Sequence, residues 1–426
     1  MTRDLTRRQA IGITGAALGS PFLAAPLYAQ SSGHVVVIGG GFGGASAART
    51  LRRVAPGISV TLLVDAAEFT TCPFSNLVIG GLRDISDIRF SYDALRSEGV
   101  DVRVDPATAL DPAAREVVLQ SGDRLSYDRA IVSPGIDFRW DALPGVSADV
   151  AETLPHAWKA GAQTLLLRDQ IQAMPEGGTV IIAPPDNPFR CPPGPYERAS
   201  LIAHYLSQHN PTAKVLIVDG KDKFSKQGLF MAGWQALYPG MISFIPFAEH
   251  GGLKEIDAGA KRIDTYFESF SADVINLIPP QSAASIALEA GLTGTGMWCE
   301  IDGLTFESRE AENVHVIGDA AIVGDMPKSG FSAATQGKVC AHAIATLLAG
   351  NAPERGYLMN TCYSLVAPDY GISVAGVYQS DDDNRLSSLP GTGGTSEAGD
   401  HPQLRRDEAD YARGWYASIT QELFGA

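Results

Sequence analysis

A glycine cluster near the start of the chain, residues 39–44 (GGGFGG), limits most strongly what this sequence can fold into. It follows the short apolar run 34–38 (HVVVI), and the pattern after it predicts a helix over residues 45–54. Residues 59–64 have the composition of a second strand. The order strand, glycine turn, helix, strand is typical of a βαβ unit in a parallel sheet. The G-x-G-x-x-G spacing within it predicts a dinucleotide site.

Each glycine of the motif has a separate expected role. Gly39 lets the chain turn sharply, Gly41 lets the backbone approach a pyrophosphate, and Gly44 lets the helix pack closely on the strand. The phosphates are then expected at the helix N-terminus, where free N–H groups point. Asp65 ends the second predicted strand and is the expected acceptor for the ribose hydroxyls.

A later segment, residues 316–321 (VIGDAA), bears on which dinucleotide binds, because nicotinamide and flavin dinucleotides share the glycine motif. It resembles the second FAD motif of two-dinucleotide-fold flavoproteins, in which the aspartate, here Asp319 after Gly318, contacts the ribityl chain. A helix predicted from about Ser332 to Leu348 would point its positive N-terminus at the flavin. A plain turn aspartate is the alternative for Asp319.

The order of predicted elements indicates an α/β protein with two Rossmann-like, glutathione-reductase-like domains and a C-terminal α+β domain, the first domain being discontinuous. Further strands are expected at 125–135, 177–183, 214–219 and 313–319, strand-rich structure at 360–378, a loop at 380–405 and a helix at 407–423. The expected boundaries are 1–29 for a signal peptide, 30–150 and 295–350 for the FAD-binding domain, 151–294 for a second Rossmann-like domain, and 351–426 for the C-terminal domain.

The first residues have the three regions of a twin-arginine signal peptide. Residues 6–9 (TRRQ) supply the arginine pair, residues 10–25 are apolar and small, and residues 27–29 (LYA) offer a cleavage point. A chance arginine pair before an ordinary helix is the alternative. Because this export route carries folded proteins, the pattern predicts a cofactor-containing protein of the periplasm.

Charge and cysteine content narrow the class of partner. The net charge of −15 argues against a nucleic-acid partner and suits a basic or patchily positive protein. After the signal segment, no stretch approaches the ~20 apolar residues of a membrane span. The chain has five cysteines but no Cys-x-x-Cys-His, so it attaches no c-type haem, and no His/Cys cluster has metal-site spacing.

Cys72 lies in the segment 70–76 (TTCPFSN), which follows the ribose-binding strand at the place where a flavin ring is expected. A thiolate there has the chemistry to add to the flavin methyl group, and a buried structural cysteine is the alternative. Together with residues 187–198 (NPFRCPPGPYER), 327–331 (PKSGF) and 360–364 (NTCYS), this segment resembles the flavoprotein subunit of flavocytochrome c sulfide dehydrogenase.

The resemblance implies a specific set of site residues. Cys72 would bind FAD covalently, and Cys191 and Cys362 would form a redox disulfide over the flavin. Lys328, in the PKSGF segment, is a candidate cofactor-binding residue. The substrate would be hydrogen sulfide, oxidised to sulfur or polysulfide, and the electrons would pass to a separate c-type cytochrome subunit.

The second predicted domain departs from the pattern of a nicotinamide-dependent reductase. Its first strand runs into residues 184–188 (PPDNP) instead of a glycine motif. Prolines lack N–H donors, so this loop is not expected to cradle a pyrophosphate. Glu197 follows Cys191 by six residues and either handles protons or satisfies backbone N–H groups at a helix N-terminus. Cys299 and Cys340 have no motif around them and are expected to be structural.

Two other functions compete with this interpretation. A sulfide:quinone oxidoreductase would share the catalytic cysteines but needs a membrane-binding helix. Residues 411, 415, 419 and 423 line one apolar face, yet four acidic residues make that helix unlike a membrane-surface helix. The second alternative is an accessory flavoprotein of a sulfur-oxidation complex, active only through its partner.

Overall fold

The computed structural model describes residues 32–143, 145–399 and 401–425, so the predicted signal peptide lies outside the described residues. The first sheet is parallel throughout, in the order β20-β9-β1-β2-β5. Strand β20 comes from far along the chain, so the fold of the first domain is discontinuous, as predicted. The strand bounds are Gly33–Ile38 (β1), Ile58–Val64 (β2), Asp101–Val104 (β5), Arg129–Val132 (β9) and Val314–Val316 (β20).

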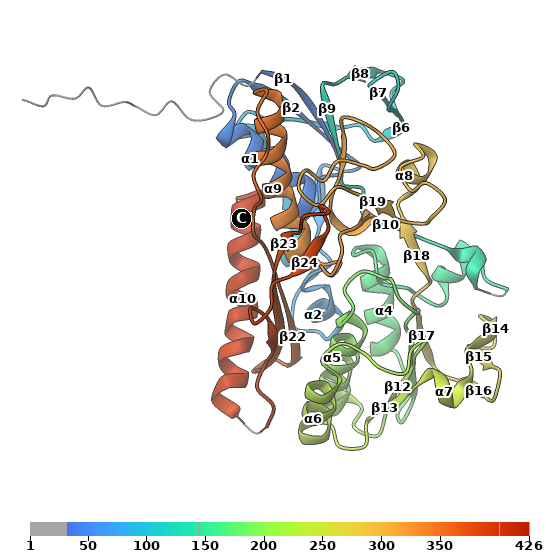
Figure 1. Ribbon diagram of the computed structural model, residues 1–426. Coiled ribbons are helices and arrows are strands. Elements are labelled where there is room, and N and C mark those ends of the chain that lie inside the picture. Colours follow the sequence, from blue (N-terminus) through green and yellow to red (C-terminus); the bar gives the residue numbers. More distant parts are fainter. Residues whose placement is uncertain (1–31, 144, 400, 426) are drawn as a thin grey trace, which may run out of the picture.

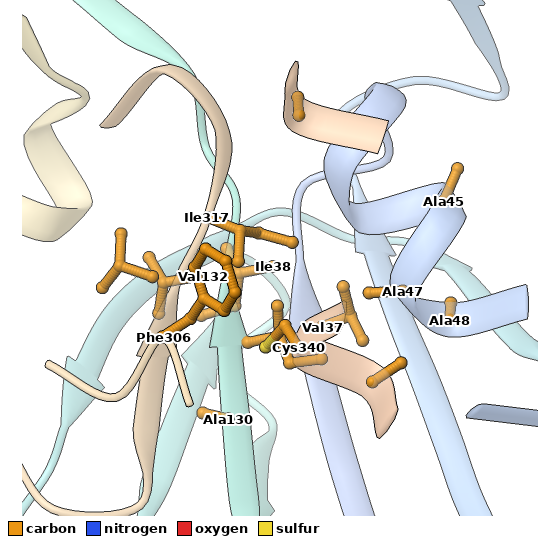
Figure 2. Close-up of a cluster of buried hydrophobic side chains, with 14 of the residues drawn as sticks. Val37, Ile38, Ala45, Ala47, Ala48, Ala130, Val132, Phe306, Ile317 and Cys340 are labelled. Carbon is orange, nitrogen blue, oxygen red and sulfur yellow. The ribbon is translucent and has the colours of Figure 1, made fainter. Parts of the chain in front are cut away.

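Two helices, α1 (Phe42–Val54) and α9 (Gly330–Leu348), pack together on this sheet (Figure 1). They can approach closely because small residues meet at the crossing: a Cβ on Gly337 would lie 2.4 Å from the carbonyl oxygen of Gly43. Figure 2 shows the resulting core, in which Val37, Ala47 and Cys340 gather. Cys340 is fully buried in this core, as expected for a structural cysteine.

The second sheet is also parallel, in the order β13-β12-β11-β17, and forms the second Rossmann-like unit. Strands β11 and β17 are nearly all buried, the pattern of a sheet covered on both faces. The strand bounds are Thr179–Ala183 (β11), Lys214–Val218 (β12), Ile242–Ile245 (β13) and Val274–Leu277 (β17), and the helix bounds are Ala162–Gln172 (α4), Gly194–His209 (α5) and Gln227–Leu237 (α6).

The C-terminal part is a long antiparallel hairpin followed by a helix. Strands β22 (Leu358–Ala367) and β23 (Tyr370–Ser380) pair along their length, as the strand-rich prediction required. The predicted loop over 380–405 is partly wrong, because β24 (Leu386–Ser388) and β25 (Gly394–Thr395) both pair with β23. These strands are too short to leave a periodic pattern in the sequence.

Helix α10 (Pro402–Phe424) runs along one side of the molecule and ends beside α1 (Figure 1). Of the apolar face weighed as membrane-binding, Ile419 and Leu423 are buried in the core of the first domain, while Tyr411 is 59% exposed. The face is therefore used mostly for packing within the chain. Within the described residues no helix combines the length and apolarity needed to cross a membrane.

Short elements complete the fold at the edges of the two main sheets. Within the described residues, the short strands form five small sheets: β3–β4, β6-β7-β8, β10–β18, β14-β15-β16 and β19–β21. Their bounds are Glu68–Thr70 (β3), Arg89–Ser91 (β4), Ala107–Asp111 (β6), Glu116–Leu119 (β7), Arg124–Ser126 (β8), Ile136–Phe138 (β10), Leu253–Asp257 (β14), Arg262–Thr265 (β15), Ser269–Ser271 (β16), Gln281–Ala283 (β18), Cys299–Glu300 (β19) and Ala321–Ile322 (β21); the short helices are Ser75–Ile79 (α2), Asp93–Ser97 (α3), Phe247–His250 (α7) and Ser285–Glu289 (α8).

Candidate active site

A cavity of about 500 Å³ lies where the two Rossmann-like units and the C-terminal part meet. Its wall includes the glycine turn before α1, the N-terminal ends of α5 and α9, strand β22 and helix α10. All three cysteines singled out by the resemblance line it: Cys72, Cys191 and Cys362. Three reactive side chains from segments far apart in the sequence thus line the same cavity.

The glycine turn has the geometry that each predicted role requires. Gly39 has a φ of +97°, and a Cβ there would lie 2.3 Å from the carbonyl oxygen of Ser133. A Cβ on Gly44 would lie 1.9 Å from the carbonyl oxygen of Gly39, so only glycine lets the helix pack against the strand. Gly41 lines the cavity, and a Cβ there would meet no atom closer than Phe69 Cζ at 3.4 Å. The turn leaves open backbone at the N-terminus of α1, where a phosphate is stabilised.

Asp65 comes directly after β2 and lines the same end of the cavity, with Glu68 and Tyr92 beside it. Its side chain is exposed, so its carboxylate is free to accept from a ribose placed over the glycine turn. Burial raises the pKa of the Tyr92 phenol, and the neighbouring charge of Asp65 adds to the effect. Tyr92 is therefore a neutral wall residue.

Asp319 supplies a buried oxygen that no residue of the protein satisfies. Its Oδ1 has no hydrogen-bond partner, while its Oδ2 lies 3.8 Å from Nη1 of Arg190. Gly318 before it has a φ of +74°, and its N–H donates to Gln336 at 2.7 Å. An unpaired buried acceptor on the cavity wall fits the ribityl hydroxyls of FAD, since such a group is costly when left unpaired. The residues present therefore fit the cofactor.

Lys328 is the predicted cofactor-binding residue of the PKSGF segment. It lines the cavity, but its ammonium donates to the carbonyl oxygens of Asp319 (2.9 Å) and Ala321 (2.6 Å) and lies over the ring of Trp298. Burial lowers its pKa to about 8. In this structure Lys328 holds the backbone of the Asp319 turn, and a direct contact with the cofactor stays a prediction.

The Cys72 sulfur lies beside a cation that the sequence interpretation did not single out. Nη2 of Arg190 donates to Cys72 Sγ at 3.2 Å and also to the carbonyl oxygen of Trp158. Since Nη1 of Arg190 reaches toward Asp319, this one guanidinium lies between the cysteine and the predicted ribityl site. Arg190 directly precedes Cys191 in the sequence, and that adjacency was the available signal.

Cys191 and Cys362 are both free thiols in the structure, so their predicted pairing stays a prediction. Cys191 has a φ of +54°, and its N–H donates to the carbonyl oxygen of Lys328 at 2.8 Å. Nδ2 of Asn360 donates to the Cys362 sulfur at 3.3 Å. Burial raises the pKa of the Cys191 thiol, and the nearby Cys362 and Glu197 raise it further.

Glu197 connects three parts of the cavity wall. It lies in the first turn of α5, but its oxygens accept from Leu365 N in β22 (2.9 Å) and from Asn76 Nδ2 in α2 (2.7 Å). Neither donor belongs to its own helix, so the predicted helix-capping alternative is wrong in that form. Burial raises the pKa of Glu197, which favours a protonated carboxyl beside the cysteines. Proton handling by Glu197 stays a prediction.

In the second Rossmann-like unit, the acidic residue at the end of β12 already has partners within the protein. Asp219 follows β12, is fully buried, and accepts from Tyr196 Oη (2.5 Å) and from Lys221 Nζ (2.6 Å). Lys221 Nζ also donates to the carbonyl oxygen of Pro185, in the proline loop after β11. Lys221 thus links the acidic group to the loop, and both carboxylate oxygens of Asp219 already accept hydrogen bonds from the protein.

Cys299 is fully buried beside the cavity wall, and burial raises its pKa to about 12. It does not line the cavity, in agreement with the expected structural role. Two further residues near the cysteines, Lys226 and Asn360, were not singled out from the sequence. Asn360 stood within the NTCYS segment, whereas Lys226 has no motif around it.

A glycine turn on one parallel sheet, a returning Gly318-Asp319 turn and a second Rossmann-like unit define a flavoprotein of the two-dinucleotide-fold class. Three family models match the chain: "Pyridine nucleotide-disulphide oxidoreductase" over residues 33–170, "Sulfide dehydrogenase [flavocytochrome c] flavoprotein chain, central" over 164–279, and "Flavocytochrome c sulphide dehydrogenase, flavin-binding" over 354–424. The chain is also 64% identical over 45 residues to the sulfide dehydrogenase [flavocytochrome c] flavoprotein chain of Chlorobaculum thiosulfatiphilum, covering 11% of this chain and 94% of that sequence. The chain belongs to the flavoprotein-chain family of flavocytochrome c sulfide dehydrogenase.

Sulfide:quinone oxidoreductases are more distant relatives. The sulfide-quinone reductase of Aquifex aeolicus is 34% identical over 103 residues, which is 24% of each chain. The mitochondrial enzyme of Dictyostelium discoideum is 24% identical over 74% of this chain and 70% of its own length. Among solved structures, the Aquifex aeolicus sulfide:quinone oxidoreductase superposes with a TM-score of 0.71 at 19% identity, over 91% of both chains. At that identity the likeness shows the fold, which is the predicted one.

Proposed function

We propose that the chain is the flavoprotein subunit of a periplasmic sulfide dehydrogenase, which oxidises hydrogen sulfide to sulfur or polysulfide and passes electrons to a c-type cytochrome. The observation that carries this function is the placing of Cys191 and Cys362, from two parts of the fold, on the wall of the cavity that holds the FAD motifs. Family membership supports the same substrate and partner.

The cysteines carry the proposed chemistry as a redox disulfide. Hydrosulfide attacks the Cys191 sulfur of the Cys191–Cys362 bond, a new sulfur–sulfur bond forms, and Cys362 leaves as a thiolate. Cys191 then holds a persulfide, as the resemblance to sulfide:quinone oxidoreductases implies. Asn360 donates to the Cys362 sulfur, which suits a negative charge there. FAD, when bound, accepts an electron pair and releases single electrons.

Other residues of the chain would bind FAD and would transfer the proton of hydrogen sulfide. Gly39, Gly41 and the N-terminus of α1 would bind the pyrophosphate, Asp65 the ribose, and Asp319 the ribityl chain. Glu197, whose pKa is raised by burial and whose charge acts on Cys191, would supply or remove the proton of hydrogen sulfide. Cys72, on the same wall, would bind the flavin covalently.

Two features weigh against the alternative functions. The proline loop and the internal hydrogen bonds of the Asp219 carboxylate argue against a nicotinamide donor in the second domain. Burial of Ile419 and Leu423 removes most of the apolar face that a quinone-dependent enzyme would place in a membrane. An accessory flavoprotein would differ in one measurable respect, since the isolated subunit would not react with sulfide.

Anaerobic mixing of the purified subunit with sulfide, followed by an artificial acceptor, tests the proposed function. The expected result is bleaching of the flavin absorbance by sulfide and none by micromolar NADH. Bleaching by NADH would place the chain with the nicotinamide reductases, and no reaction with sulfide would leave the accessory function.

Single replacements test the disulfide. Cys191→Ser and Cys362→Ser should keep bound FAD and a native thermal midpoint but lose reduction by sulfide, while Cys340→Ser should stay active. Peptide mapping without reductant gives the direct answer: free thiols at 191 and 362 in the oxidised, active enzyme would overturn the mechanism.

A further inference from the structure

Lys226 is a buried lysine in contact with the strand that carries Cys362. Its Nζ donates to the carbonyl oxygen of Cys362 at 2.8 Å and to Ser364 Oγ at 2.8 Å. The side chain is only 7% exposed, so the ammonium group lies within the protein beside β22. A cation has therefore been brought to the backbone of the second cysteine from the residue that precedes helix α6, 136 positions away along the chain.

The charged groups around Lys226 come from every element packed against it. Cys191 and Glu197 face it from the α5 segment, Cys362 from β22, and Glu408 from α10. Burial lowers the pKa of Lys226 to about 8, and these four groups oppose that shift. Lys226 in turn favours the charged form of the Cys191 thiol. Arg198 is a second buried cation near Cys191 and Glu197, but its own hydrogen bonds are to Asn76, Asn276 and two backbone carbonyls.

Two features of this position are unfavourable for a residue with a purely structural role. An ammonium group loses its hydration when it is buried, and an apolar side chain of similar length would fill the space without that cost. Lys226 also has a φ of +61°, a left-handed conformation that is uncommon for a residue with a side chain. The protein therefore has a lysine at this position, beside two thiols, despite the cost of burying its charge and the cost of its left-handed backbone.

We propose that Lys226 is a positioning residue for the sulfur chemistry, whose positive charge beside Cys362 and Cys191 stabilises the sulfur anion released when the disulfide opens. The inference rests on the proposed function. In the step it serves, hydrosulfide forms a bond to Cys191, the Cys191–Cys362 bond breaks, and the negative charge of hydrosulfide passes to Cys362. A cation near the leaving sulfur lowers the energy of that charge in a site where water is scarce.

Replacement of Lys226 separates its charge from its hydrogen bonds. Lys226→Gln removes the charge and keeps a donor toward the Cys362 carbonyl, whereas Lys226→Arg keeps the charge. Lys261→Met is the matched control, because Lys261 also has a positive φ and donates to a backbone carbonyl, that of Asp273, but is not among the charges that act on Cys191. The measurement is the rate of alkylation of each cysteine by iodoacetamide in the dithiothreitol-reduced holoenzyme, from pH 6 to pH 10, read by peptide mass.

The expected result is about tenfold slower alkylation of Cys191 and Cys362 in Lys226→Gln at each pH, because the neutral side chain no longer favours the thiolate. Lys226→Arg and Lys261→Met should keep the wild-type alkylation rates. Wild-type alkylation rates in Lys226→Gln would overturn the proposal. If that variant does not accumulate as a folded flavoprotein, Lys226→Met provides the same neutral comparison.

The same proteins distinguish this inference from the proposed function. Anaerobic sulfide should bleach the wild-type flavin, and the bleaching rate should fall about tenfold in Lys226→Gln with FAD content and thermal midpoint unchanged. A wild-type flavin that does not respond to sulfide would refute the proposed function, while the alkylation rates would still report on Lys226. Normal bleaching in every variant would refute the role of Lys226 alone.

Discussion

At the scale of single residues, two kinds of residue define the cofactor site. One kind is a glycine whose surroundings leave no room for a Cβ, and the other is a buried polar side chain without a hydrogen-bond partner. Gly44 belongs to the first kind, because its Cα lies against the carbonyl of Gly39. Asp319 belongs to the second, with a buried oxygen that only a bound group can satisfy. Such residues identify a ligand site more firmly than exposed polar residues do, because contacts within the protein do not explain why a buried polar atom stays unpaired.

Gly44→Ala should lose most of its bound FAD. The new Cβ would overlap the Gly39 carbonyl and force α1 away from β1, which opens the turn that binds the pyrophosphate. Gly414→Ala, in the interior of α10 where nothing lies within 4 Å, should keep its FAD and gain about 0.5–1 kcal/mol of stability. Flavin absorbance per protein after gel filtration checks both, and full FAD content in Gly44→Ala would contradict the geometry.

Cys72→Ala should bind FAD only non-covalently. The cavity wall keeps its other contacts, so the variant should be yellow but release all its flavin on acid precipitation. The wild-type protein should retain its flavin in the pellet. If the wild-type supernatant takes up all the yellow colour, Cys72 does not bind the cofactor covalently.

Glu197 should make stability depend on pH. Its folded pKa lies above the ordinary value of 4.5, so its favourable contribution is complete below about pH 4.5 and is lost as the pH rises through the raised value. Glu197→Gln does not titrate, and the free energy of unfolding of the variant should therefore improve relative to wild type between pH 5 and pH 8. Urea unfolding of both proteins at the two pH values measures this, and a difference independent of pH would show that the carboxyl is ionised throughout.

At the scale of elements, helix α10 acts as a clamp on the first domain. A Cβ on Gly371 would lie 2.4 Å from the Ala409 nitrogen, so the hairpin and the helix are in close contact along β23. The far end of α10 inserts Leu423 and Phe424 into the core around β1 and α1. Its acidic residues do not all face solvent, since Glu408 is buried and paired with Arg405 at 3.1 Å.

Leu423→Ala should destabilise the protein by about 2–5 kcal/mol, because Leu423 is fully buried and its removal leaves a cavity. Tyr411→Ala, on the same helix but 59% exposed, should change the free energy of unfolding by no more than about 0.5 kcal/mol. Thermal or urea unfolding compares the two. A neutral Leu423→Ala would mean that the end of α10 is not packed on the domain.

Elements with a strong periodic pattern could be predicted from the sequence, and those that depend on distant partners could not. The strands β1, β2, β11 and β12 and the helix α9 lie within a few residues of their predicted positions. Strands β24 and β25 were missed because their only support is pairing with β23. The site divides in the same way: the glycines and cysteines were recognisable from local motifs, whereas Lys226 reaches the site only through folding.

At the scale of the whole molecule, the acidic surface suits the proposed electron transfer to a separate protein. The net charge is −15 for the full sequence. Opposite charge raises the rate of encounter with a partner, and salt screens it beyond a Debye length of about 8–10 Å at physiological ionic strength.

Reduction of a basic c-type cytochrome by the sulfide-treated protein should slow as salt is added. The second-order rate constant is expected to fall by at least about tenfold between 10 mM and 300 mM salt, because encounter is steered by charge. An uncharged artificial acceptor is the control and should react at a nearly constant rate. Equal salt dependence for the two acceptors would argue against electrostatic docking.

The cavity has a further consequence because all three parts of the chain contribute to its wall. A group that fills it contacts every part at once, and its binding energy adds to the stability of the folded state. For a dissociable ligand that gain follows the free concentration and disappears on dilution. A ligand bonded to Cys72 has no free concentration, so the gain would survive any dilution. The covalent bond would then stabilise the folded arrangement of all three parts of the chain permanently.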